Sequence, residues 1–262
     1  MCRAGLARFP AALRCGSGHS FDLARQGYVN LTTGRVPHSG DTAEMVAARV
    51  AFLNAGHFDL IADALGDAAG PRAGLVVDAG TGTGRYLAAV LDRVPDRVGL
   101  GLDVSKPALR RAARAHPRAG AALADLWRPL PLADASAAVL LNVFAPRNGA
   151  EFRRVLRPDG VLLVVTPAAD HLSELVDALG LLRVDPDKAQ RVAGSLGESF
   201  TAAGASTHRR IMTLTRAEVH TLVAMGPSAW HTEPDRLADA VAALREPVSV
   251  TAAVDVTRWA AA

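Results

Sequence analysis

Long apolar runs and cysteines are scarce in this 262-residue chain. The longest apolar stretches, such as residues 161–165, fall far short of the roughly 20 residues that span a bilayer, and no continuous apolar segment of a secretory signal opens the sequence. We therefore expect a cytoplasmic protein without a membrane partner. The only cysteines, Cys2 and Cys15, argue against a disulfide framework. Two thiols near one end of the chain can still serve as metal ligands.

Lysine is almost missing, since Lys106 and Lys188 are the only two. The formal net charge of +3 resides entirely in residues 1–50, which hold six arginines against three acidic residues. Guanidinium groups suit bidentate phosphate contacts, so this segment is where a polyanion would dock. Two alternatives are a solvated surface and the arginine bias of a GC-rich genome.

Three segments follow from composition and length. Residues 1–33 form a small module that is too short for a core of its own without a staple. Residues 34–70 form a linker followed by helices: turn-forming residues fill 32–42, and helical spacing of apolar residues predicts helices over 42–52 and 59–65, the second ending near Gly66. Residues 71–262 form the large domain.

Short apolar runs alternate with helical stretches from residue 75 onward. The expected strands are 75–77, 98–102, 121–124, 137–141 and 161–165, and the expected helices are 86–93, 107–115 and 151–156. Strands without polar alternation, separated by helices, indicate a parallel sheet that is covered on both faces. Residues 211–214 and 248–256 follow as strands, and the second alternates as a half-exposed antiparallel strand would. The fold class is therefore α/β, with a Rossmann-like sheet.

A glycine-rich loop, DAGTGTG at residues 78–84, follows the first of these strands. Glycines there permit a tight turn and let a ligand approach the backbone at a helix N-terminus. The rhythm of Gly80, Gly82 and Gly84, with Arg85 where a dinucleotide fingerprint needs its last glycine, favours S-adenosylmethionine. Asp78 at the loop entrance would repel a pyrophosphate but attract the cationic groups of S-adenosylmethionine.

Two further acids end the next two strands. Asp103 stands where a carboxylate can accept both ribose hydroxyls, and its alternative role is the N-cap of the helix before Lys106. Asp125 can accept the exocyclic amine of adenine while Leu126 packs on the ring. Each acid alone is more often structural, but three in this order favour a class I methyltransferase that uses S-adenosylmethionine.

The methyl acceptor of this architecture lies after the fourth strand, at residues 142–148. The segment lacks the Asn/Asp-Pro-Pro-Tyr/Phe tetrad expected of amino-group methylation. Phe144 can stack on a base, although a lone aromatic is more often core. Asp125 and Asn142 are the candidate catalytic residues, and the sequence identifies no general base.

Several stretches together resemble the RlmA/TlrB family of 23S rRNA guanine-N1 methyltransferases. They are residues 19–31, 41–49, 52–58, 102–107 and 166–172, so the resemblance spans almost the whole chain. Residues 142–148 and 225–231 look closest to the TlrB type, whose members protect macrolide producers by methylating guanine 748 near the drug-binding tunnel.

The resemblance implies a zinc-finger-like module for RNA recognition within residues 1–33. Family members carry a Cys-x2-Cys pair and then a Cys-x3-His pair; Cys15 and His19 match the second pair, and Cys2 matches the second cysteine of the first. The remaining cysteine would fall just before Met1. Either the start lies upstream or the zinc site has three protein ligands, which leaves one coordination position open.

The resemblance also implies cofactor contacts at Thr81, Gly82, His171 and Phe58, where related proteins often have Tyr. It implies a 23S rRNA hairpin near the macrolide-binding tunnel as the partner, and macrolide resistance as the outcome. A homodimer is considered as the assembly. The competing hypotheses are a small-molecule methyltransferase of natural-product biosynthesis and a non-catalytic RNA-binding protein that keeps a relic cofactor loop.

Overall fold

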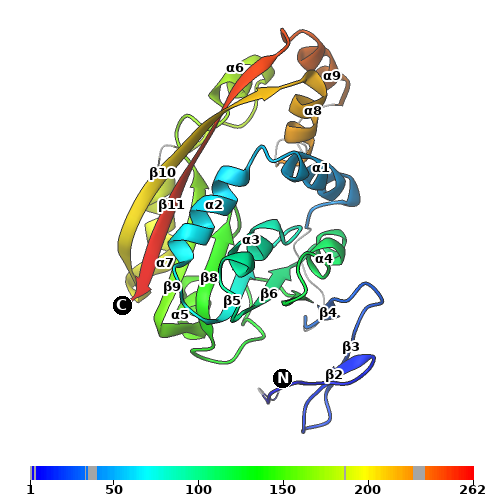
Figure 1. The fold of residues 1–262 in the computed structure, drawn as a ribbon, viewed down its shortest axis with the longest axis vertical. Helices are drawn as coiled ribbons and strands as arrows, with labels where there is room; N and C mark the ends of the chain where they lie inside the picture. The colour runs from blue at the N-terminus through cyan, green and yellow to red at the C-terminus, as the bar shows by residue number, and fades with distance from the viewer. Residues whose placement is uncertain (1, 3, 33, 35–39, 186, 227–233) are drawn as a thin grey trace.

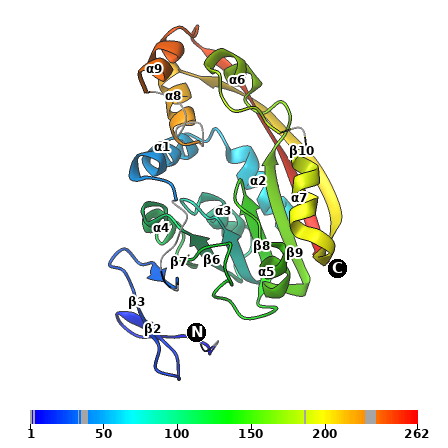
Figure 2. The same cartoon turned by 180° about the vertical axis from the view of Figure 1, so that it is seen from behind.

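The computed structural model describes residues 2, 4–32, 34, 40–185, 187–226 and 234–262. Within these residues an eight-stranded sheet forms the centre of the molecule, and a three-stranded sheet forms the N-terminal module. Figures 1 and 2 show the module at one end, the large sheet with its helices in the middle, and α6, α8 and α9 at the far end.

The large sheet has the order β10-β11-β9-β8-β5-β6-β7-β4. All neighbours from β9 to β4 run parallel, whereas β10 and β11 pair antiparallel with each other and β11 pairs antiparallel with β9. The strands are β4 (Val29–Asn30), β5 (Gly74–Ala79), β6 (Arg97–Asp103), β7 (Ala119–Leu123), β8 (Ala137–Val143), β9 (Leu156–Pro167), β10 (Phe200–Leu214) and β11 (Val248–Ala261). The expected α/β class with a Rossmann-like sheet is confirmed.

The helices lie between the strands and at the far end. They are α1 (Ala43–Asn54), α2 (Asp59–Ala69), α3 (Arg85–Arg93), α4 (Lys106–Ala112), α5 (Gly149–Val155), α6 (Ser173–Leu179), α7 (Lys188–Leu196), α8 (Arg216–Ala224) and α9 (Pro234–Ala242), with a 3-10 turn η1 at Gly197–Ser199. Thr42 begins α1 as its N-cap, accepting a hydrogen bond from the Met45 backbone.

The parallel strands read as continuous apolar runs because both faces of the sheet are covered. Val76 belongs to the core cluster on the α2 and α3 side, whereas its neighbour Val77 belongs to the cluster that contains Phe152 of α5 and Val192 of α7. Successive side chains of a strand point to opposite faces, so a strand with helices on both sides needs apolar residues at every position.

Helix α2 is longer than the sequence predicts, because it continues through Gly66 to Ala69. A Cβ at Gly66 would lie 2.9 Å from Nε of Arg93. The Arg93 guanidinium pairs with Asp63 and Asp67 on either side of this glycine. Gly66 is therefore a packing site for an arginine of α3, not a helix terminator.

The strand expected at 211–214 is the end of a much longer strand, β10, which begins at Phe200. Strand β11 pairs with β10 over almost the whole length of β10. The pairing is antiparallel, as the alternation of residues 248–256 predicts. Figure 1 shows the two strands running together along one edge of the molecule.

The N-terminal module consists of β1 (Ala7–Arg8), β2 (Ala12–Arg14) and β3 (Ser20–Asp22), which pair antiparallel in that order. The following strand, β4, already pairs with β7 in the large sheet. Most of the linker 32–42 and residues 227–231 of the family stretch 225–231 lie outside the described residues.

No single helix in the described part of the chain is long and apolar enough to span a bilayer; α1 and α2 qualify only as a pair, with a bend of 78° between them.

Candidate functional site

The glycine loop joins β5 to α3 at the carboxyl edge of the sheet. Gly80 and Gly82 have φ of +90° and +53°, values that L side chains rarely adopt. The backbone N–H groups of Gly80 and Thr81 donate to the carbonyl of Leu102 at the end of β6. These bonds hold the loop against the neighbouring strand.

A cavity of about 60 Å³ lies beside this loop. Its lining includes the loop residues 80–83, together with side chains of α1, α3 and the segment after β8. The remaining lining residues are Arg49, Leu53, Phe58, Arg85, Tyr86, Val143, Phe144 and Met225. The structure therefore brings four expected cofactor residues together at one cavity: Phe58, Gly80, Thr81 and Gly82.

Asp78 lies beneath the loop and is almost completely buried. Its Oδ2 accepts a hydrogen bond from the Thr81 hydroxyl at 2.9 Å, but its buried Oδ1 has no partner among the described residues. Burial raises the pKa of Asp78 to about 7, and the nearby charge of Asp103 acts in the same direction. A cationic group would supply the missing partner.

Asp103 is also bound to the loop. Its Oδ2 accepts from the Gly82 backbone N–H and its Oδ1 from that of Ser105, each at 2.8 Å. Burial raises the pKa of Asp103 above its ordinary range, although the two N–H groups oppose the shift. The alternative of Asp103 as a helix N-cap is wrong, because Ser105 fills that position by accepting from the Ala108 N–H.

Gly84 and Asp125 lie outside this cavity. Gly84 is the N-cap of α3, and a Cβ there would come within 2.9 Å of Ala112 in α4, so the glycine allows two helices to pack closely. Asp125 is buried at the end of β7, where its Oδ1 accepts from the Trp127 N–H and its Oδ2 lies 3.7 Å from Nε of Arg128.

The segment after β8 lies against the loop, with Ala145 next to Gly80, and Phe144 of this segment lines the cavity. Asn142 has no exposed surface, and its amide nitrogen donates to the carbonyls of Ala79 and Pro146. Its amide therefore ties β5 to this segment. Phe144 is 43% exposed and has φ of +51°, which is strained for a bulky residue. The alternative of Phe144 as a core residue is wrong.

His171 packs near two of the aromatic residues that line the cavity, with its ring centroid 5.9 Å from that of Phe58 and 6.1 Å from that of Phe144. Its Nδ1 accepts a hydrogen bond from the backbone N–H of Ala253. Burial lowers the pKa of His171 to about 4, so the ring is neutral at physiological pH. A neutral imidazole that accepts at Nδ1 carries its proton on Nε2 and can only donate there.

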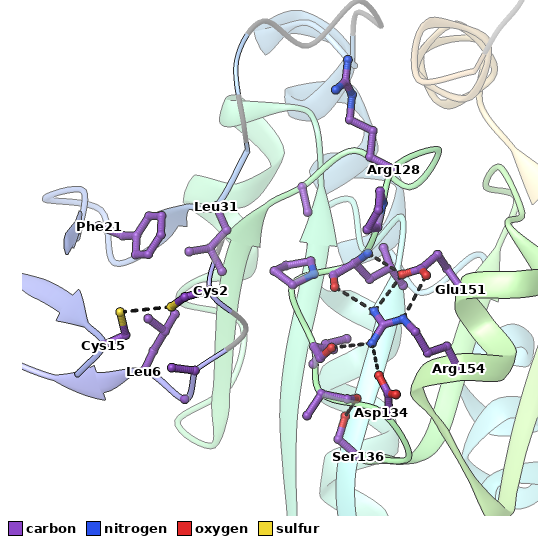
Figure 3. A pocket seen from close by; sticks show the side chains of 18 of the residues that line it. Cys2, Leu6, Cys15, Phe21, Leu31, Arg128, Asp134, Ser136, Glu151 and Arg154 are labelled. Atoms are coloured by element: carbon purple, nitrogen blue, oxygen red, sulfur yellow. Dashed lines mark hydrogen bonds and ion pairs between the residues drawn. The ribbon is translucent and has the colours of Figure 1, made fainter. Parts of the chain in front are cut away.

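A second and larger cavity, of about 890 Å³, lies between the N-terminal module and the segment from Ala124 to Ser136 (Figure 3). Arg154 forms part of its wall and binds Glu151, Asp134 and the carbonyls of Leu130 and Leu132. Arg128 lies at the cavity as well, and the exposed Trp127 precedes it in the sequence. No glycine of the loop lines this cavity.

Cys2, Cys15 and His19 gather at the same cavity. The two sulfurs are 3.6 Å apart, and each lies 3.3 Å from Nδ1 of His19. Tetrahedral zinc with usual bond lengths needs separations of about 3.8 Å between sulfurs and about 3.5 Å between sulfur and nitrogen. The three donors therefore fit one face of a zinc tetrahedron, and the described residues place no fourth His, Cys, Asp or Glu in the group.

The thiol of Cys2 is suited to such a site. A backbone hydrogen bond with Ala4, together with side-chain contacts to Ser17 and Cys15, lowers the pKa of Cys2 to about 6. Thiolate is the form that binds metal.

Comparison with known proteins identifies the family. The model of the N-terminal domain of RlmA matches residues 1–33, and a methyltransferase domain model matches residues 76–160. The chain is 68% identical to a putative 23S rRNA (guanine-N1)-methyltransferase of Micromonospora griseorubida, over 95% of this chain and 90% of the relative. This chain belongs to the family of 23S rRNA (guanine-N1)-methyltransferases. The family resemblance seen in the sequence is confirmed.

Two further comparisons extend this assignment. The chain is 52% identical to the 23S rRNA (guanine(748)-N1)-methyltransferase of Streptomyces fradiae, over 98% of this chain and 93% of the relative. A putative methyltransferase from Bacillus halodurans has the same fold, with a TM-score of 0.53 and 14% identity over 76% of this chain and 97% of that one.

Sequence reasoning missed some cavity residues of this family member. Arg49, Arg85, Tyr86 and Met225 line the cavity but were not expected there. Arg49 ends the family stretch 41–49, so its place in a family motif was the available signal. Met225 reaches the cavity from the end of α8 and begins the family stretch 225–231, so a family motif was the available signal for this residue too.

Proposed function

We propose that this chain transfers a methyl group from S-adenosylmethionine to N1 of a guanine in 23S rRNA, and that the target corresponds to guanine 748 of its Streptomyces fradiae relative. The observation that carries the proposal is the meeting of the glycine loop and the acceptor segment at one cavity, where Gly80 and Phe144 are both part of the wall. The loop that binds the methyl donor and the segment that presents the base are thus neighbours.

The residues around the glycine loop suit the parts of S-adenosylmethionine. Thr81 and Gly82 contact it along the cavity, Asp78 binds its ammonium, and Asp103 accepts its ribose hydroxyls. Asp125 accepts the adenine amine. The buried, unpartnered Oδ1 of Asp78 supports this assignment, because a buried carboxylate oxygen needs a donor. S-adenosylmethionine supplies a sulfonium methyl group that an aligned nucleophile can displace.

The acceptor side must orient a guanine and accommodate the loss of its N1 proton. Phe144 offers an exposed ring for stacking, and Asn142 fixes the segment that presents it. His171 donates from Nε2 to an acceptor of the base, so it stabilises charge that moves onto the guanine as N1 loses its proton. His171 does not take that proton itself, since Nε2 already carries one.

The N-terminal module recruits the RNA. The basic excess of residues 1–50 and the large cavity between module and methyltransferase domain support this role. Cys2, Cys15 and His19 hold a zinc ion that fixes the module. The substrate is a hairpin near the macrolide-binding tunnel, as the family resemblance implies, and its unpaired loop exposes the guanine edge. The reaction we propose takes place in the cytoplasm, and a methyl group at that site confers macrolide resistance.

Methylation of a defined transcript tests the proposal. The protein is incubated with labelled S-adenosylmethionine and two 23S rRNA hairpins, one natural and one with adenine in place of guanine 748. A methyl on N1 blocks the pairing edge, so we expect a reverse-transcription stop at that guanine and no label in the adenine hairpin.

Three outcomes would count against this function. Label at a different nucleotide refutes the target, and turnover of a small natural product without any RNA label favours the biosynthetic alternative. Cofactor binding without transfer to either RNA would instead favour the non-catalytic RNA-binding alternative.

A further inference from the structure

Arg49 of α1 is the one cavity arginine with a buried donor that has no partner in the described part of the chain. Its terminal nitrogen Nη2 donates to Asp41 at 2.6 Å and to the carbonyl of Met225 at 2.8 Å. Its Nε is buried and makes no hydrogen bond to any described residue. Burial of an N–H without an acceptor is costly, so an acceptor is expected there when the site is complete.

The position of Arg49 is fixed from three sides. Asp41 precedes α1, and the Asp41 carbonyl accepts from the Ser105 hydroxyl at the start of α4. Met225 follows α8 at the other side of α1. A Cβ on Gly82 would lie 3.8 Å from Cδ of Arg49, so the side chain runs along the glycine loop. The guanidinium is therefore held beside the loop before any ligand binds.

Arg49 and Asp78 flank the same part of the loop with opposite charges. The Thr81 hydroxyl donates a hydrogen bond to Asp78, while the Arg49 side chain lies against the next residue, Gly82. Among the described residues, only two buried side-chain atoms without a hydrogen-bond partner belong to groups beside this loop, and they are Nε of Arg49 and Oδ1 of Asp78. One unmet donor and one unmet acceptor fit a zwitterion.

We propose that Arg49 binds the α-carboxylate of the amino-acid end of S-adenosylmethionine, opposite the ammonium held by Asp78. This inference rests on the proposed cofactor and adds a residue to its site. Guanidinium is the side chain best suited to a carboxylate, because its donors lie in one plane. Asp41 and Met225 use both donors of Nη2, which leaves the buried Nε–H of Arg49 to donate to one carboxylate oxygen of the ligand.

Arg85 is the competing arginine, since it also lines the cavity. Its Nη2 pairs with Asp59 at 2.5 Å, both side chains are 41% exposed, and none of its nitrogens is both buried and without a partner. Water can solvate such a pair, so nothing in its surroundings calls for a further anion. Arg85 is therefore a matched control: same residue type, same cavity, same kind of acidic partner.

The test compares two ligands that differ only in the carboxylate. These are S-adenosylhomocysteine and its decarboxylated analogue, and calorimetry measures the affinity of each for the full chain. Wild-type protein should prefer S-adenosylhomocysteine by about 10- to 100-fold, as expected of a charge-assisted contact. Arg49→Gln should abolish most of this preference by weakening S-adenosylhomocysteine alone, whereas Arg85→Gln should keep it within about threefold.

Each outcome decides the proposal. Equal wild-type affinity for the two ligands overturns it even if Arg49→Gln does not fold, and so does a preference that is lost in Arg85→Gln but kept in Arg49→Gln. Equal weakening of both ligands by Arg49→Gln assigns the residue a structural role only. If wild-type protein binds neither ligand, the proposed cofactor itself is wrong, which is a separate result.

Discussion

Protonation of Asp78 should control how tightly the protein binds S-adenosylmethionine. Burial raises the pKa of this carboxyl to about 7, and only one of its oxygens has a hydrogen-bond donor. If the ionised form binds the ammonium, affinity follows the ionised fraction. With a pKa of about 7, that fraction falls about 25-fold between pH 7.5 and pH 5.5.

The same pKa sets a stability trend in the protein without cofactor. The pKa of Asp78 in the folded protein lies above the ordinary value of an aspartate, so the contribution of Asp78 to stability is complete at low pH and is lost as pH rises from about 4 to about 7. This difference in pKa corresponds to at most about 4 kcal/mol of unfolding free energy. Asp78→Asn should remove this loss and make the cofactor-free protein more stable at pH 8.

Calorimetry between pH 5.5 and 7.5 checks the binding trend. Wild-type affinity should drop steeply toward the acid end, and Asp78→Asn should bind weakly with little pH dependence. Urea unfolding at pH 5 and pH 8 checks the stability trend. A flat wild-type binding profile, or an Asp78→Asn variant with wild-type affinity at pH 7.5, would refute the reasoning.

Three other changes test separate parts of the site. Asp103→Ala leaves the N–H groups of Gly82 and Ser105 without their acceptor. Urea unfolding should therefore show a free energy of unfolding lower by about 2–5 kcal/mol, and calorimetry should show a cofactor affinity at least about tenfold weaker. Unchanged values in both assays contradict the assigned role. Gly80→Val should abolish methylation, because a Cβ there would lie 2.4 Å from Cβ of Ala145. The macrolide tolerance of a sensitive bacterium should therefore rise with wild-type protein but not with this variant. Equal tolerance of the two strains, with the methyl detected only in the wild-type strain, would dismiss the resistance role. His19→Ala should lower bound zinc, measured by mass spectrometry, and rRNA methylation, while cofactor affinity stays unchanged; full RNA turnover by this variant would show that the module is dispensable.

The parallel half of the sheet was predictable because its physics is local. Strands covered by helices on both faces need apolar residues at every position, and β5, β6, β7, β8 and β9 all appear as such runs in the sequence. Strand β10 was mostly missed for the opposite reason. Its residues between Thr201 and Ile211 are largely exposed, so its length comes from backbone pairing with β11 and leaves no apolar pattern.

The site was predictable where a motif carries the chemistry. The glycines and Asp78 follow directly from the strand–loop–helix pattern, and the structure places them together. Arg49 and His171 instead depend on tertiary packing: α1 must cover the loop, and Ala253 of β11 must lie against the histidine ring. Neither relation leaves a spacing in the sequence, so only a family motif could point to these residues.

The tautomer of His171 bears on how N1 of guanine loses its proton. If His171 were the general base, its removal would make the rate rise with pH, because the N1 proton would then have to leave without a base. The bond from Ala253 to Nδ1 and the pKa of about 4 make it a neutral donor instead. We therefore expect His171→Ala to lower the single-turnover rate by about 100-fold, as the loss of one donor to developing charge does.

The shape of the rate profile from pH 6 to pH 9 should stay the same in that variant. His171→Gln keeps an N–H donor at a similar reach, so it should recover part of the rate. Calorimetry with S-adenosylhomocysteine serves as the control. If His171 only binds the cofactor, its removal should lower the affinity for this ligand and leave the rate at saturating cofactor unchanged. A new pH-dependent limb in His171→Ala, with no recovery in His171→Gln, would identify the histidine as the base. An unchanged pH profile in His171→Ala, together with partial recovery of the rate in His171→Gln, would mean that the N1 proton leaves to solvent or to the RNA. The enzyme then stabilises the charge left on the base.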